Sequence, residues 1–127
     1  IECRVIFCGT SNDICKNLKQ SKIFAFPSAF EGFSLAMTEA MGVGLPVVGY
    51  KSCTSISQIV KDGYNGFLCD DGIEDFADKL KCLMFDDKLR KQMGANARES
   101  MKEFAPEKIW NAWETLIQEV VENHRKS

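Results

Sequence analysis

Two glutamates lie on either side of a predicted helix start. Glu31 and Glu39 are eight residues apart, and Ser34 between them is suited to cap a helix that begins at Leu35. Gly32 lets the backbone come close to a ligand. The free N–H groups and the dipole of a helix start favour an anion, whereas carboxylates repel phosphate and accept hydrogen bonds from hydroxyl groups. The pattern predicts a site for a ligand with both phosphate and hydroxyls, such as a nucleotide sugar, although spacing alone would also fit two exposed surface charges.

A short apolar and aromatic run precedes this site and predicts the strand that positions it. Residues 23–26 suit a buried strand, and Pro27 ends it because proline cannot continue a central ladder. Similar runs predict strands at 5–8, 45–50 and 67–69, alternating with helices at 14–20, 35–41 and 56–61.

Alternating strands and helices imply an α/β fold, a Rossmann-like parallel sheet of about four strands. Such sheets bind ligands at the carboxyl ends of their strands. We therefore expect the loops 9–13, 28–34 and 51–55 to converge on one cleft.

Three amphipathic helices are predicted after Asp71. The first carries an apolar stripe over 73–84, and Asp86 with Asp87 can cap the second, whose inner face holds Leu89 and Met93. Pro106 fits the first turn of the third, which has a wide apolar face over 109–121.

Composition indicates an ordinary globular chain of a single domain, 1–127. The chain is 45% hydrophobic and 27% charged with a net charge of −2, and it has no basic run of the kind that marks nucleic-acid binding. No apolar run approaches the roughly 18 residues that span a bilayer. We expect a cytoplasmic protein, and the strand-like start at 5–8 suggests a fragment of a longer one.

Six cysteines form no C-x-x-C pair, and His124, the one histidine, lies far from all of them in sequence. Free cysteine in apolar runs behaves as a small hydrophobe. The pattern predicts reduced thiols and no zinc site.

The ordered motifs resemble the retaining GT-B glycosyltransferases, most closely their large family 4, also called group 1. They are Phe-Pro-Ser-x-x-Glu-Gly-Phe-Ser-x-x-x-x-Glu-Ala-Met at 26–41, Gly-Leu-Pro-Val-Val at 44–48 and Ile-Val-Lys-Asp-Gly-Tyr-Asn-Gly-Phe-Leu at 59–68. The resemblance runs the length of the chain and implies the C-terminal, donor-binding part of a two-domain enzyme.

The resemblance also implies roles for residues. Glu31, the catalytic candidate, would contact hydroxyls of the donor sugar, and Glu39 would bind the nucleotide ribose. Backbone N–H groups of Gly32, Phe33, Ser34 and Leu35 would face the diphosphate. The segment with Thr10, Ser11 and Asp13 would border the base. The family transfers sugar with retention and without a bound metal, so the resemblance implies a nucleotide-diphosphate sugar as substrate and no cofactor.

Three departures from the family pattern stand out. Ser34 replaces a frequent glycine, and Gln58 stands where a glutamate is usual before Ile-Val-x-Asp-Gly. The family's donor domain also begins with two further strands and their basic residues, and it follows an acceptor domain. None of these precedes Ile1, so we expect this chain alone to be inactive.

The missing parts imply partners. One expected partner is the acceptor domain of the same enzyme, which could bring the protein to the inner face of a membrane. Another is a second copy of the chain, bound through an open strand edge or through the last helix. Two other hypotheses stay open. One is a GT-B-like sugar-nucleotide epimerase, which would use histidine in the cleft. The other is a non-catalytic α/β interaction module, such as a receiver, which would need an aspartate at a strand end.

Overall fold

A computed structural model describes residues 4–125 and contains a small parallel sheet. Its strands are β1 (Phe24–Phe26), β2 (Val47–Tyr50) and β3 (Gly66–Cys69), in the order β1-β2-β3. Phe24 lies opposite Val47, and Val47 lies opposite Gly66. Since the strands are parallel, their carboxyl ends meet at one edge, as predicted from the alternation of strands and helices.

The strand predicted at 5–8 does not form. These residues have no regular structure and are exposed, so the described part of the chain has three strands rather than about four. A strand needs a neighbour to pair its backbone groups. In the described residues, β2 occupies one edge of β1 and nothing pairs with the other.

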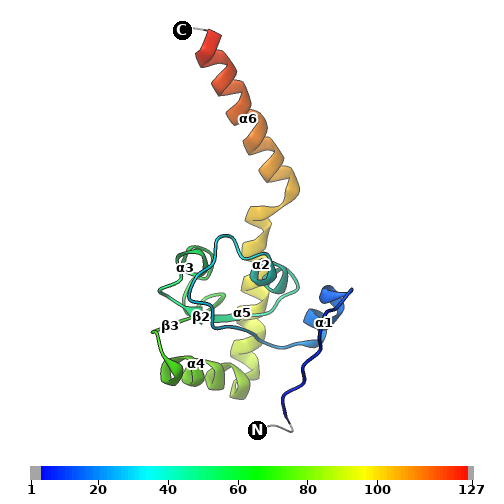
Figure 1. Cartoon of the computed structure of the whole chain (residues 1–127), viewed down its shortest axis with the longest axis vertical. Coiled ribbons are helices and arrows are strands. Elements are labelled where there is room, and N and C mark those ends of the chain that lie inside the picture. Colours follow the sequence, from blue (N-terminus) through cyan, green and yellow to red (C-terminus); the bar gives the residue numbers. More distant parts are fainter. Residues whose placement is uncertain (1–3, 126–127) are drawn as a thin grey trace.

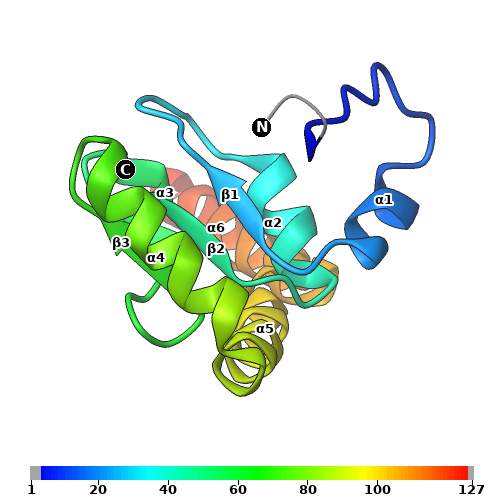
Figure 2. The ribbon, with the colours of Figure 1, turned by 90° about the horizontal axis from the view of Figure 1, so that it is seen from below.

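Three helices contribute to the core on one face of the sheet, and the last of them also contributes to the opposite face. They are α2 (Leu35–Gly42), α3 (Thr54–Ile59) and α5 (Asp87–Ser100). Their side chains form a core cluster with Val47 of β2, and the cluster includes Met37, Met41, Ile56 and Ala97. Figure 2 shows α2 beside β1 and β2.

The opposite face is covered by α4 (Ile73–Phe85). Val48, the neighbour of Val47, points to this side because successive strand residues alternate. It packs with Cys69, Leu83 and Met93. The two faces give the layered α/β arrangement predicted from the sequence (Figure 2).

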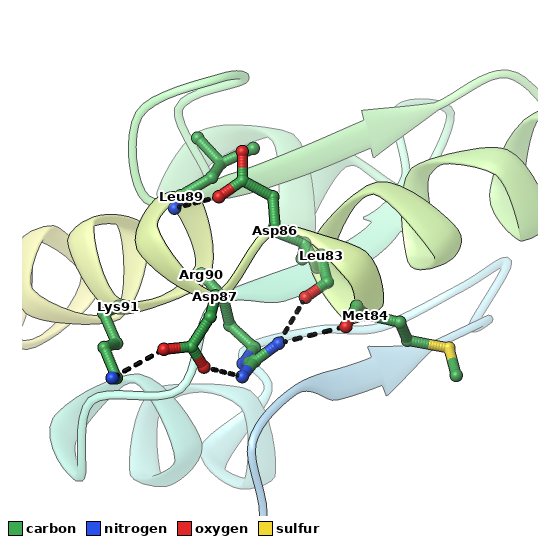
Figure 3. Close-up of polar contacts among 7 residues, drawn as sticks. All are labelled: Leu83, Met84, Asp86, Asp87, Leu89, Arg90 and Lys91. Atoms are coloured by element: carbon green, nitrogen blue, oxygen red, sulfur yellow. Dashed lines mark hydrogen bonds and ion pairs between the residues drawn. The ribbon is translucent and has the colours of Figure 1, made fainter.

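The junction between α4 and α5 is held by polar contacts, drawn in Figure 3. Asp86 caps α5, as predicted, and its Oδ1 accepts from the N–H of Leu89 at 2.8 Å. Arg90 donates to the carbonyl oxygens of Leu83 at 2.7 Å and Met84 at 3.3 Å, and it also pairs with Asp87. The guanidinium therefore satisfies the free carbonyl groups at the end of α4.

Two helices lie outside this core. α1 (Ile14–Gln20) buries no residue and packs beside α2. After a short 3-10 helix, η2 (Met101–Phe104), α6 (Pro106–Arg125) extends away from the sheet (Figure 1). Its apolar face, predicted over 109–121, is exposed along its length, with Val120 60% exposed. In the described residues no helix is long and apolar enough to cross a membrane.

Candidate functional site

The N-terminus of α2 lies at the carboxyl edge of the sheet. Ser34 caps it as predicted, because its Oγ accepts from the N–H of Met37 at 3.3 Å. The Ser34 side chain is almost completely buried. The helix start is therefore fixed to the core, while Leu35 beside it is 66% exposed.

Glu31 is positioned by a neighbour that the sequence analysis did not assign. Its Oε1 accepts from the Ser28 hydroxyl at 2.9 Å. The spacing Ser28-x-x-Glu31 was the signal that could have identified this pair. One hydrogen bond leaves most of the carboxylate's acceptor capacity available to a ligand.

Gly32 has open space beside it. A Cβ built there meets nothing within 4 Å, and the backbone φ is not positive. The fold therefore gives no reason for glycine at this position. Space beside a helix start is what a ligand needs to approach the backbone closely.

An aromatic contact attaches the loop between β1 and α2 to the short helix η2. The rings of Phe33 and Phe104 lie 5.7 Å apart between centroids. Phe30 is 89% exposed. The loop is therefore anchored at Phe33, next to the residues that would contact a ligand.

Glu39 lies on the exposed surface of α2. It borders a cavity of about 330 Å³ between α1 and α2. Its walls are mostly apolar and come from Ile14, Cys15, Leu18, Gly42 and Val43. The sequence analysis noted the shared face of Ile14 and Leu18 but did not connect it with Glu39. The carboxylate thus borders an apolar hollow.

The residues predicted on the base side have a different setting. Since 5–8 is not a strand, Thr10, Ser11 and Asp13 do not follow a strand end. Asp13 caps α1 by accepting from the N–H of Lys16 at 2.9 Å, and Ser11 accepts from Asn17 at 3.0 Å. Within residues 4–125 no hydrogen bond joins this segment to the loop 27–34, so its base-side role stays a prediction.

The loop after β2 is tied to the loop after β3. Tyr50 donates to the carbonyl of Gly72 at 3.2 Å, and Ser52 donates to Asp71 at 2.5 Å. Lys51 pairs with Asp70, and this hydrogen-bonded contact raises the pKa of the lysine. These contacts connect the loop 51–55 with the loop after β3, whereas the convergence of the loops 9–13, 28–34 and 51–55 on one cleft stays a prediction.

The thiols are free in the described chain. Cys53 and Cys69 are buried, whereas Cys8, Cys15 and Cys82 are exposed. Cys3 lies outside the described residues. Between residues 4 and 125, no group of three His, Cys, Asp or Glu side chains is placed to hold a metal ion.

Comparison with known proteins decides between the three hypotheses. The family model for glycosyl transferases group 1 matches residues 1–100. The chain belongs to this family. The resemblance drawn from the motifs is thus confirmed, as is the α/β class of the fold.

Related proteins are similar to this chain both in sequence and in structure. The chain is 34% identical over 127 residues to N-acetyl-alpha-D-glucosaminyl L-malate synthase of Bacillus anthracis, covering 98% of this chain and 33% of that protein. It is similar to TarM of S. aureus, whose structure was solved with UDP, with a TM-score of 0.84 and 32% identity over 91% of this chain and 24% of TarM.

A third comparison places the chain within the family fold. It matches the C-terminal domain of the group 1 glycosyl transferase LpcC from Francisella tularensis, with a TM-score of 0.66 and 30% identity, over 77% of this chain and 50% of that domain. The chain corresponds to part of a group 1 C-terminal domain. It spans a third of the length of the first two curated relatives it matches.

Proposed function

We propose that this chain forms part of the donor site of a retaining glycosyltransferase. The donor would be a nucleotide-diphosphate sugar, and the acceptor a glycan or lipid in the synthesis of a polysaccharide or glycoconjugate. Support comes from the family membership and from relatives solved with UDP.

The N-terminus of α2 would receive the diphosphate. Its first N–H groups lack partners within the helix, and they carry the positive end of the helix dipole. The backbone of Gly32, Phe33, Ser34 and Leu35 would face the phosphates. Fixed N–H groups stabilise the charge that builds on a departing diphosphate, and no metal is required for that role.

The two carboxylates would accept hydrogen bonds from hydroxyl groups on either side of the diphosphate. Glu31, held by Ser28, would accept from the donor sugar, and Glu39, beside the cavity between α1 and α2, would accept from the ribose. The bond between the anomeric carbon and the phosphate oxygen breaks, and the acceptor oxygen bonds to that carbon on the same face. The hydroxyl proton leaves with the diphosphate.

The capped start of α2, with Glu31 and open space at Gly32 beside it, is the observation that carries this proposal. Neither φ nor packing requires glycine there, and the position lies two residues before the Ser34 cap. A ligand at the helix start accounts for a residue without a side chain.

A binding titration of the intact enzyme that carries this chain tests the proposal. Several UDP- and GDP-sugars would be titrated against wild type, Glu31→Gln and Glu39→Gln. Loss of a charged acceptor is expected to weaken binding about tenfold or more. Glu74→Gln is the matched control, because Glu74 is an exposed glutamate in the first turn of α4. Normal binding and turnover by both site variants would rule out the assignment.

We further propose that the rest of the enzyme completes the site and that catalysis takes place in the cytoplasm, where a reducing environment suits free thiols. The exposed apolar face of α6 would contact either the acceptor domain or a second copy. Light scattering of the purified chain distinguishes a self-associating chain from a monomer.

A further inference from the structure

Another concave surface lies at the opposite edge of the sheet from the loop 27–34, and it shares Leu18 and Val43 with the cavity beside Glu39. It has a volume of about 350 Å³ and lies between α1, the segment 43–45 and the start of α5. The segments 21–22 and 43–45 precede β1 and β2, so this cleft is at the amino ends of the strands. The cleft is therefore distinct from the loop 27–34.

The cleft is basic, in contrast to the chain as a whole, whose net charge is −2. Its charged lining consists of one carboxylate, Asp87, and four cations, Lys19, Lys22, Arg90 and Lys91. The C-terminal ends of α1 and α2 also border it and contribute about half a negative charge each. The start of α5 contributes about half a positive charge in the same way, so a positive excess of between two and three charges remains.

The carboxylate in the cleft is already engaged. Asp87 pairs with Arg90 and with Lys91, whose Nζ lies 2.6 Å from Asp87 Oδ2 (Figure 3). Arg90 is further committed to the carbonyl oxygens of Leu83 and Met84. The hydrogen bond and charge of Lys91, with smaller effects from Arg90 and Lys22, lower the pKa of Asp87.

Two cations in the cleft have no anionic partner. In the described residues, neither Lys19 nor Lys22 forms an ion pair, and both are exposed. They approach the cleft from α1 and from the residues before β1, across from Lys91. Like charges around one hollow repel each other, and a bound anion removes that cost.

We propose that this cleft binds a small anion that carries phosphate. Lys19 and Lys22 supply the unpaired charge in the described residues, while Asp87 with Arg90 and Lys91 forms an ion-paired cluster beside them. A hollow of about 350 Å³ has room for a phosphate monoester. This inference does not depend on the roles proposed for Glu31 and Glu39.

The test is a titration of the full chain with inorganic phosphate at constant ionic strength, followed by NMR of the backbone amides. Saturable shifts are expected at 19–22 and 43–45. The double variant Lys19→Gln/Lys22→Gln is expected to weaken these shifts about tenfold or more, from two lost charge-assisted contacts. The control Lys16→Gln/Lys61→Gln removes the same charge from exposed lysines outside the cleft.

Each outcome decides the proposal. Saturation at 19–22 that is lost in the cleft variant and kept in the control supports it. Shifts confined to Gly32 and the start of α2 would place phosphate only at the donor site and would overturn it, as would equal loss in the control. A second arm uses vesicles of phosphatidylcholine mixed with phosphatidylglycerol. Binding to vesicles without binding to inorganic phosphate would indicate a surface patch for lipid and would also overturn it.

Discussion

Ser34 combines two properties at the centre of the proposed site. It caps α2, and its side chain is buried although its backbone lies where a phosphate would bind. The family often has glycine here. A serine keeps the position small while it satisfies a free N–H group, so this departure from the family pattern is compatible with the site.

Replacement of Ser34 therefore tests the cap directly. Ser34→Ala is expected to lower the free energy of unfolding by about 1 kcal/mol, the usual cost of a lost N-cap. Urea unfolding measures the change. Ser57→Ala is the control, since that hydroxyl donates only within α3 and is exposed. Equal losses in the two variants would contradict a capping role.

Cys69 gives a prediction about pH. Burial raises the pKa of its thiol from 9.0 to about 11, with a smaller contribution from the negative charge of Asp75. The folded chain keeps this proton where the unfolded chain releases it. The stability linked to the thiol is therefore complete below about pH 9 and is lost as the pH rises to about 11.

Urea unfolding across this range checks the sign. Wild type is expected to lose stability more steeply between about pH 9 and 11 than Cys69→Ala, in which the titrating group is absent. Cys82→Ala is the control, because that thiol is exposed. A slope in Cys69→Ala as steep as in wild type would show that the linkage is wrong.

At the scale of elements, α5 packs against the loop after α2 with no room for a side chain. A Cβ on Gly94 would lie 2.2 Å from the carbonyl oxygen of Gly44, far inside van der Waals contact. Gly44 itself has a φ of +92°. This close approach holds α5 against the segment that leads into β2.

Gly94→Ala is expected to cost about 3 kcal/mol of unfolding free energy, because one of the two backbones must shift. Gly42→Ala is the matched control, since Gly42 lies in a helix with nothing within 4 Å of the added Cβ. That change is expected to be neutral or stabilising by up to about 1 kcal/mol. Chemical denaturation of both variants measures the difference, and equal stabilities would contradict the packing.

Local patterns predicted most elements correctly. Apolar periodicity located α4, α5 and α6. The capping residue Asp86 located the start of α5, and Pro106 located the start of α6. The strand before Pro27 and the cap at Ser34 follow from the same kind of local rule. These features depend on residues a few positions apart, so a sequence alone contains them.

Features that depend on distant residues were not predictable in this way. The strand at 5–8 needs a neighbour that the described chain does not provide. Asn65 stood only within the motif 59–68, with no role assigned. It is completely buried, accepts from the N–H of Lys61 at 2.7 Å and donates to Ser100 at 3.0 Å. No local pattern connects Asn65 with a residue 35 positions away.

The molecule as a whole leaves surfaces uncovered. α6 extends from the core with an exposed apolar face (Figure 1), and β1 has no neighbour on one edge in the described residues. An isolated helix of this kind gains little stability without a partner. The chain also spans only a third of its first curated relatives.

We therefore expect the 127-residue chain alone to transfer no sugar. A donor half-site without an acceptor surface cannot bring the acceptor oxygen to the anomeric carbon. Incubation of the purified chain with a nucleotide sugar and candidate acceptors, followed by mass spectrometry of products, measures this. The intact enzyme is the positive control. Measurable transfer by the isolated chain would contradict the expectation.

The central claim is that the two carboxylates at α2 bind different parts of one donor. The most direct measurement compares the affinity of UDP with that of the best-binding UDP-sugar in the intact enzyme. Glu39→Gln is expected to weaken both ligands about tenfold or more, whereas Glu31→Gln is expected to weaken only the ligand that carries sugar. If Glu31→Gln weakens UDP equally, or if neither variant changes either affinity, the assignment of sugar and ribose to these residues is wrong.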